Sequence, residues 1–309
     1  MSEKFEIQQI LDQPDQCLKL ALSICQKHSL PSDCVRIGNQ TQHVFAVAQR
    51  FIIKFFPPSD PNAFQIERTF LQSLYQQLPI RTPELYAADS LDGADYIVME
   101  HLPGTAIEHV WGTLSIAEQG DIMGQLGRAI HALHALPVGD FQTAPSDWHS
   151  FIDQQKQDLI TNHRNFGLDD AWVSQLSEYV DSRTLDLHDR AQIVPLHTEL
   201  MQEHIFLSRD AKGWQVAGMI DFEPAMLGHR EYEFCAVGLF LTQGKRELLR
   251  EFLVSYGYAE ADLTAEFSRR IMILMLLHRY SDLSWFLALI PSDRHVTTLA
   301  QLEQFWYGV

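Results

Sequence analysis

Basic residues are scarce in this 309-residue chain, which carries 23 Lys and Arg against 40 Asp and Glu and has a formal net charge of −17. It contains no run of Lys and Arg, and binding to a nucleic-acid backbone depends on such clusters. We therefore expect no nucleic-acid partner. An acidic surface instead favours the approach of cationic small molecules.

Cysteine is also sparse, and the four present include no CxxC pair. Three of them, Cys17, Cys25 and Cys34, lie close together at the start of the chain, and Cys235 lies far from them. We expect buried reduced thiols, and neither a disulfide framework nor a zinc site. Internal repeats and low-complexity tracts are absent as well.

Long apolar runs are missing too. The longest uncharged apolar run near the C-terminus covers residues 271–277, whereas a bilayer span needs roughly 20 apolar residues. The run therefore predicts a buried helix and no membrane partner. Residues 1–16 lack a basic segment followed by an apolar stretch and a small-residue cleavage site, so we expect no secretory signal and a cytoplasmic location.

The first hundred or so residues alternate between strand and helix patterns. An amphipathic helix is expected over residues 4–28, and short alternating runs over residues 34–56 predict a hairpin with a polar turn. A helical period follows over residues 64–78, then two strands over residues 84–90 and 95–102. Together these elements predict a small antiparallel sheet with one helix packed on it.

From residue 103 the pattern becomes mainly helical. A Pro-Gly turn leads into a long predicted helix over residues 114–136, and two further helical segments are expected over residues 147–185. Short strands are expected around residues 193–222, and the rest of the chain is expected to be mainly helical. This change of pattern places a predicted domain boundary at about residue 102.

Several polar residues stand out against apolar surroundings. Two histidines and two acids interrupt a short apolar frame in PLHTELMQEHIFL, residues 195–207, and Asp221 follows an apolar strand in GMIDF. Lys54 is the only lysine of the expected early sheet, in FIIKFF, and Glu67 lies in the following helix. The stretch YIVMEHLPGTAI, residues 96–107, runs from a strand into a Pro-Gly turn.

These segments, in this order and at these separations, resemble the aminoglycoside phosphotransferase superfamily. That superfamily includes hygromycin phosphotransferases, choline kinases and homoserine kinases, and the resemblance covers most of the chain. It implies a two-lobed α+β fold of the protein-kinase-like type. Residues 1–102 are then a small antiparallel-sheet, nucleotide-binding lobe, and residues 103–309 a larger, mainly helical lobe for catalysis and acceptor binding.

The resemblance implies a nucleotide site in the first lobe. Lys54 is expected to pair with the nucleotide phosphates, with Glu67 as the ion-pair partner that fixes it. The turn at Gly38 occupies the place of the nucleotide-covering loop, and backbone groups of Glu100 and Leu102 are expected to meet the base. Taken alone, Lys54 and Glu67 are equally compatible with surface charges.

The loop at residues 197–204 matches the family's catalytic pattern with two changes. His197 matches the histidine, Glu199 replaces the aspartate that acts as catalytic base, and His204 replaces the asparagine that binds metal. Asp221 matches the aspartate that binds Mg²⁺. An imidazole ligand favours Mn²⁺ over Mg²⁺, and His204 is alternatively expected to hydrogen-bond a phosphate or Glu199 instead of binding metal.

The favoured function is transfer of the γ-phosphoryl group of ATP or GTP to a hydroxyl of a small molecule. An aminoglycoside-like acceptor and another natural product or metabolite remain equally open. The two substitutions leave a second interpretation, a nucleotide-binding pseudoenzyme without efficient transfer. A third interpretation drops the kinase and uses His197, Glu199 and His204 as the two-histidine, one-carboxylate iron site of an oxygenase.

Overall fold

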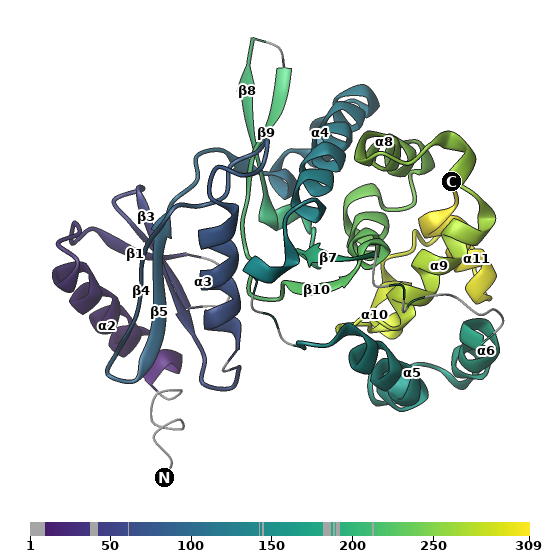
Figure 1. Ribbon diagram of the computed structural model, residues 1–309, viewed down its shortest axis with the longest axis horizontal. Coiled ribbons are helices and arrows are strands. Elements are labelled where there is room, and N and C mark those ends of the chain that lie inside the picture. Colours follow the sequence, from purple (N-terminus) through teal and green to yellow (C-terminus); the bar gives the residue numbers. More distant parts are fainter. Residues whose placement is uncertain are drawn as a thin grey trace.

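A five-stranded antiparallel sheet forms one side of the computed structural model, and helices form most of the other side (Figure 1). The structure describes residues 10–37, 43–60, 62–141, 143, 145–181, 187, 189, 192–211 and 213–309. The strand order in the sheet is β1-β2-β3-β5-β4. Its strands are β1 (Cys34–Ile37), β2 (His43–Val47), β3 (Phe51–Phe56), β4 (Leu85–Leu91) and β5 (Ala94–Glu100).

The stretch over residues 34–56 holds three strands, so the prediction of a single hairpin is wrong. The additional turn joins β2 to β3 at Ala48 and Gln49, which both have positive φ, at 49° and 53°. Two-residue hairpin turns of this type normally carry Asn or Gly, because side chains strain a left-handed backbone. Neither residue is present here, so the turn left no signal in the sequence.

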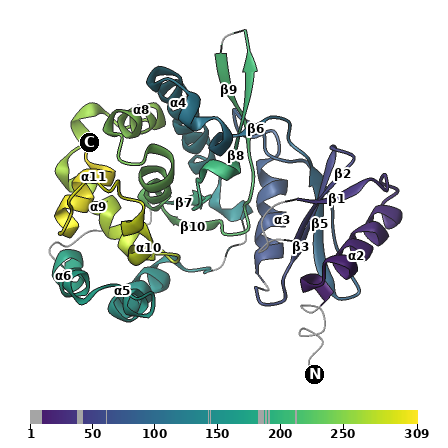
Figure 2. The same cartoon turned by 180° about the vertical axis from the view of Figure 1, so that it is seen from behind.

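The middle strand β3 is buried on both faces, and its alternate side chains belong to two different layers of the core. Phe51, Ile53 and Phe55 pack against helix α2 (Pro14–Lys27). Residues of the other face, such as Ile52, pack toward helix α3 (Ala63–Leu74). The two helices therefore cover opposite faces of the sheet, as both views show (Figures 1 and 2).

The larger part of the protein is built from helices around short strands. The helices of eight or more residues are α4 (Ile116–His134), α5 (Trp148–Asn165), α6 (Asp170–Asp181), α8 (Arg246–Tyr256), α9 (Ala265–Leu276) and α11 (Leu299–Tyr307). Helices α4 and α8 approach closely because glycine faces the contact. A Cβ atom added at Gly127 would lie 2.3 Å from the carbonyl oxygen of Phe252.

Two small sheets within the helical part hold the loops that carry the candidate site. Strand β7 (Ile193–Leu196) pairs with β10 (Met226–His229), a strand that the sequence did not predict. Strand β8 (Ile205–Asp210) pairs with β6 (Thr105–Ala106) and β9 (Gly213–Met219). The loop at residues 197–204 therefore leaves β7 and enters β8, and Asp221 follows the end of β9.

The α+β, kinase-like fold class predicted from the sequence is confirmed. Residues 271–276 are buried within α9, as expected. No helix of the described residues is long and apolar enough to cross a membrane. The first sheet ends at Glu100, but the hydrophobic core continues beyond it, because Phe70 of α3 packs against Phe141 and Phe222. The division into lobes at residue 102 stays a prediction.

Candidate active site

Lys54 of β3 is the centre of a buried cluster of charges. Its Nζ atom lies 2.6 Å from Asp221 Oδ1, 2.8 Å from Glu223 Oε2 and 3.0 Å from Glu67 Oε2. Lys54 is 3% exposed and Glu67 is fully buried. The interpretation of these two residues as surface charges is therefore wrong. The structure brings Lys54 and Glu67 together, as the sequence predicted, and adds two acids from the loop after β9.

Burial and charge oppose each other in this cluster. Burial alone lowers the pKa of Lys54, but the charges of Asp221 and Glu67 outweigh it and hold the pKa well above its ordinary value. Burial raises the pKa of Glu67 to about 7, against the effect of Lys54 and with the help of Asp221. Glu67 Oε1 is buried without a hydrogen-bond partner among the described residues.

The loop after β7 has a strained backbone that a buried acid holds in place. Thr198 has a φ of 72°, which is rare for a β-branched residue. The Glu233 carboxylate accepts hydrogen bonds from the backbone N–H groups of His197, at 2.7 Å, and Thr198, at 2.9 Å. The Thr198 hydroxyl donates to the carbonyl of Pro224 at 3.1 Å. These bonds fix the direction in which the next residue, Glu199, leaves the loop.

His197 connects this loop to the segment after β9 that carries Asp221. Its Nε2 atom donates a hydrogen bond to the carbonyl oxygen of Ile220 at 2.8 Å, and its Nδ1 atom accepts one from the Glu199 N–H at 3.3 Å. Burial lowers the pKa of His197, so the ring is neutral. Both ring nitrogens are in use, so the iron site of His197, Glu199 and His204 does not form in this structure.

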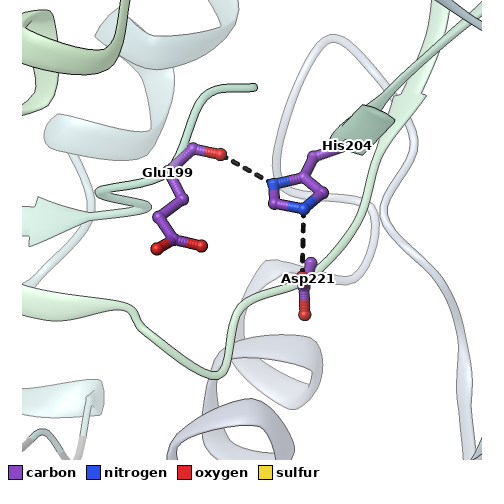
Figure 3. Close-up of side chains that lie close together, drawn as sticks. All are labelled: Glu199, His204 and Asp221. Atoms are coloured by element: carbon purple, nitrogen blue, oxygen red, sulfur yellow. Dashed lines mark hydrogen bonds and ion pairs between the residues drawn. The ribbon is translucent and has the colours of Figure 1, made fainter. Parts of the chain in front are cut away.

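His204 links the two loops from the other side (Figure 3). Its Nδ1 atom donates a hydrogen bond to the carbonyl oxygen of Glu199 at 2.8 Å, and its Nε2 atom lies 3.1 Å from Asp221 Oδ2. Burial lowers the pKa of His204, but hydrogen bonding and charge from Asp221 outweigh it and raise the pKa to about 9. At neutral pH the ring is therefore a cation, and neither nitrogen has a free lone pair.

Asp221 stands at the meeting point of these contacts. Its φ of 72° lies in the left-handed region, which aspartate tolerates better than most residues. Burial raises the pKa of Asp221, but Lys54 and His204 outweigh it and hold the pKa well below its ordinary value. The carboxylate is therefore ionised at every pH at which the protein is expected to work.

The Glu199 carboxyl differs from the other acids because no described residue forms a hydrogen bond or ion pair with it. Burial raises its pKa, and His204 opposes that rise. In Figure 3 no dashed line joins its carboxyl to His204 or Asp221, although its ligand atom lies within 4.8 Å of a ligand atom of each. A half-buried carboxyl with a raised pKa and an unused hydrogen-bonding capacity is suited to accept a proton from a bound group.

The cleft holds more acids than bases, and this donor set fits a divalent cation. Carboxylate oxygens are the ligands that Mg²⁺ prefers. When all groups are ionised, the four acids Glu67, Glu199, Asp221 and Glu223 face the two cations Lys54 and His204, which leaves two negative charges. Burial is the main cause of the raised pKa values of Glu67 and Glu199, and the neighbouring carboxylates add to it. The ligand atoms of two sets lie within 4.8 Å of one another: Glu199, His204 and Asp221, and Glu67, Asp221 and Glu223.

A cleft of about 740 Å³ opens over this cluster, a size typical of sites for small ligands. Its lining includes most of the predicted site: Lys54, Glu100, Leu102, Glu199, His204 and Asp221. His197 and Glu67 lie behind these side chains and are not part of the lining. Gly38, predicted to cover the nucleotide, lies outside the described residues.

The connection after β5 runs along the edge of the cleft. Glu100 uses its backbone N–H to bond the carbonyl of Glu84 at 2.8 Å, and its side chain pairs with Arg81. Neither backbone group of Leu102 has a hydrogen-bond partner among the described residues. Backbone groups of Leu102 are therefore free to bond a ligand in the cleft, and those of Glu100 are at least partly in use.

Two residues at the site were not assigned a role from the sequence. Glu223 follows Asp221 by two positions, and its contact with Lys54 depends on how the loop turns. Glu233 holds the loop after β7 through hydrogen bonds between positions 35 and 36 residues apart. The acidic pattern DFE is the only signal that could have indicated Glu223.

Comparisons with known proteins agree with this geometry. The model of the phosphotransferase enzyme family matches residues 34–267. The solved GDP and kanamycin complex of APH(2'')-IIIa is 16% identical with a TM-score of 0.67, and the match covers 93% of this chain and 98% of that chain. APH(3'')-Id from Streptomyces rimosus ATCC10970, in complex with ADP and streptomycin, is 18% identical with a TM-score of 0.61. That match covers 84% of this chain and 98% of that chain. At these identities the likeness shows the fold alone. A comparison with curated protein sequences finds no match.

Proposed function

Because the chain belongs to the phosphotransferase enzyme family, we propose that it transfers the γ-phosphoryl group of ATP or GTP to a hydroxyl group of a small molecule. Its general activity is that of a phosphotransferase with an alcohol acceptor. One observation carries the proposal. Lys54 of the first sheet contacts Asp221 from a loop 167 positions later, inside a cleft large enough for a nucleotide.

The nucleotide occupies the cleft over Lys54. The Lys54 ammonium group contacts the phosphates, and Glu67 holds it in that position from α3. The base lies toward residues 100–102, where the free backbone groups of Leu102 hydrogen-bond it. Glu100 lines the cleft beside the base. This assignment makes residues 1–102 a nucleotide-binding lobe and residues 103–309 a catalytic lobe.

Asp221 is the main metal ligand in this proposal. Asp221 would hold a Mg²⁺ or Mn²⁺ ion, which would supply positive charge against the phosphates during transfer. Lys54 releases part of its contact with Asp221 when it turns to the phosphates. Glu223 then supplies a second carboxylate, and His204 becomes a ligand only after its Nε2 atom loses its proton.

Glu199 is the catalytic base. The acceptor oxygen attacks the γ-phosphorus, the bond from that phosphorus to the β-phosphate oxygen breaks, and the hydroxyl proton passes to the Glu199 carboxylate. The products are a phosphate monoester and a nucleoside diphosphate. His197 and Glu233 are positioning residues, because they hold the Glu199 backbone and do not line the cleft.

The pseudoenzyme remains the second candidate, because Glu199 and His204 both depart from the family's pattern. The Glu199 carboxyl supports the active enzyme, since it lines the cleft with no other partner among the described residues. The glutamate side chain is one methylene longer than aspartate, and the strained backbone at Thr198 is the local feature that adjusts its position.

Substitution of Asp221 tests the proposed function. Asp221→Asn should reduce phosphoryl transfer below detection while circular dichroism stays unchanged, because the metal and the phosphates lose their main carboxylate. Asp89→Asn, which alters an exposed pair with Lys27, is the matched control and should keep wild-type activity. Transfer at the wild-type rate by the Asp221 variant would refute the assignment. We also propose a cytoplasmic location, where ATP and GTP are abundant and the four reduced cysteines are stable.

A further inference from the structure

A second cavity, of about 120 Å³, lies beside the nucleotide cleft in the helical part of the protein. Glu199 and Met201 line both cavities. The carboxyl group proposed as the catalytic base therefore stands at the boundary between them. A molecule seated in the second cavity reaches Glu199 without entering the space over Lys54, which is the arrangement that a phosphoryl acceptor needs.

The lining of the second cavity is mainly apolar. Its main side chains are Met201, Leu239, Phe240, Met275, Trp285 and Phe286. The ring centroid of Phe240 lies 5.6 Å from that of Trp285 and 6.0 Å from that of Phe286, so three aromatic rings form one wall. Trp285 is 47% exposed and Tyr280 is 49% exposed, so the cavity opens to solvent between aromatic side chains.

Charge is nearly absent from this lining. Among the described residues, Glu199 is the only acid that lines it. His278 is half-buried and neutral, because burial of its ring and the neighbouring Arg279 lower its pKa to about 3. An aminoglycoside carries several ammonium groups, and each one that leaves water needs an acidic partner. One carboxyl cannot pair with several ammonium groups. The negative net charge of the chain therefore does not make this cavity a site for a polycation.

The size of the cavity limits the group that it holds. A dry cavity of about 150 Å³ lined by Leu, Ile and Phe binds benzene, and the volume here is slightly smaller. Resting on the phosphotransferase function above, we propose that the acceptor is an alcohol whose hydroxyl is carried by an apolar group about the size of a benzene ring. That group enters the second cavity, and the remainder of the molecule extends past Trp285 to solvent.

The hydroxyl of such an alcohol is placed at Glu199. Its O–H bond breaks as the oxygen bonds the γ-phosphorus, the proton goes to the Glu199 carboxylate, and the nucleoside diphosphate leaves. The product is the phosphate monoester of the apolar alcohol. Trp285 and Phe240 determine specificity in this scheme, because they contact the apolar group and not the reacting atoms.

A panel of acceptors tests the inference on the full chain with ATP and Mg²⁺. Benzyl alcohol, cyclohexylmethanol and 1-hexanol are compared with kanamycin, streptomycin and choline by nucleoside diphosphate release and by detection of the phosphate ester. The comparison is repeated with Trp285→Ala and with Phe166→Ala, an exposed aromatic residue that does not line the cavity. Nucleotide binding is followed by thermal shift, and binding of benzyl alcohol by calorimetry.

We expect the apolar alcohols to have the highest kcat/KM. We expect Trp285→Ala to lower it about tenfold, the lower end of what one apolar contact contributes to discrimination, and Phe166→Ala to leave it unchanged. A higher kcat/KM for kanamycin, streptomycin or choline overturns the inference and leaves the proposed function intact. So does an equal response of the two variants.

Failure of the proposed function gives a different result, namely no thermal shift with nucleotide and no transfer to any acceptor. Calorimetry then still decides about the cavity. Binding of benzyl alcohol that Trp285→Ala weakens supports the apolar site, and the absence of binding overturns it. The same criterion applies if nucleotide binds but no acceptor is phosphorylated.

Discussion

His204 and Asp221 form an ion pair, with 3.1 Å between Nε2 and Oδ2. The Nδ1 atom of the same ring donates to a backbone carbonyl, so both nitrogens carry protons. The imidazolium ring therefore places a positive charge against the carboxylate proposed to hold Mg²⁺. In the metal-free protein, His204 stabilises the acidic cleft, and a metal ion has to compete with it for Asp221.

This pair predicts a pH-dependent contribution to stability. The pKa of His204 rises from 6.5 when unfolded to about 9 when folded. The stabilisation is therefore complete below pH 6.5 and is lost as the pH rises through about 9. It is worth roughly 3 kcal/mol at most, from 1.36 kcal/mol for each pKa unit.

Denaturant unfolding in EDTA from pH 6 to pH 9.5 measures that contribution. The difference between wild type and His204→Asn should be largest at pH 6 and should shrink toward pH 9.5. His109→Asn, at an exposed histidine, is the control and should follow the wild type at every pH. A difference that is constant across this range would show that His204 is neutral in the folded protein.

Lys54 should affect both nucleotide binding and stability. Lys54→Met removes the only cation among the described residues that contacts Glu67 and Glu223, so it should weaken nucleotide binding by about 30-fold or more, the lower end for truncation of a buried charge pair. Because Glu67 and Glu223 lose this cation and Asp221 loses one of its contacts, the variant should be destabilised more at pH 8 than at pH 5, where the acids can take up protons. Calorimetric titration and unfolding at the two pH values measure these effects.

Lys27→Met is the matched control for that variant. Lys27 pairs with Asp89 at 2.6 Å, but both side chains are exposed, at 38% and 51%. Exposed pairs contribute about 0–1 kcal/mol, so nucleotide affinity and the pH dependence of stability should both stay as in wild type. Equal behaviour of the two lysine variants would mean that Lys54 does not act on the nucleotide.

Lys54, Glu199 and Asp221 were predicted as site residues because they match the family's pattern in order and spacing along the chain. The structure brings Lys54 and Asp221 into contact, and their roles stay predictions. The third strand of the hairpin region was missed because Ala48 and Gln49 adopt a left-handed backbone without the residues that usually mark it. Local patterns do not show when tertiary packing imposes such a turn.

Contacts between distant segments explain the other omissions. Glu223 reaches Lys54 only because the loop after β9 turns toward the first sheet, and no spacing rule indicates that turn. The apolar second cavity draws on α7 (Phe234–Ala236), α9 and α10 (Leu283–Ala288), and its character follows from which helix faces meet. The overall charge of the chain pointed instead toward a cationic acceptor, because composition averages over surface and interior.

Glu233 should control catalysis through the loop that it holds. In the wild type, two backbone N–H groups donate hydrogen bonds to the Glu233 carboxylate. In Glu233→Gln the amide NH₂ faces one of these N–H groups, which leaves a buried donor unpaired at a cost of about 1–3 kcal/mol. The strained turn at Thr198 then relaxes and moves Glu199. We expect kcat to fall at least tenfold, with little change in nucleotide KM, because Glu233 does not line the cleft.

Glu303→Gln separates this positioning role from general destabilisation. Glu303 is also buried, at 4% exposed against 0% for Glu233, and accepts hydrogen bonds from Tyr179 and Arg269, both at 2.6 Å, far along the chain from the loop. Its variant should lose comparable stability in denaturant unfolding but keep its kcat. If both variants lose kcat in proportion to stability, Glu233 is only a structural residue.

The double variant Glu199→Asp with His204→Asn restores the residues usual in the family and distinguishes an adapted enzyme from a decayed one. In an adapted enzyme the aspartate ends one methylene short of the acceptor hydroxyl, and the asparagine removes the charge opposite Asp221. An error of about 1 Å in positioning costs on the order of 100-fold in rate, so kcat should fall by that order. We expect this outcome, since Thr198, Glu233 and the His204 hydrogen bond all fit the backbone to the longer acid. Steady-state transfer with each apolar alcohol, at several Mg²⁺ and Mn²⁺ concentrations, measures it, and the two single variants assign the loss. A gain in transfer by the double variant would show instead that the present pair is a decayed site that oxygen ligands repair.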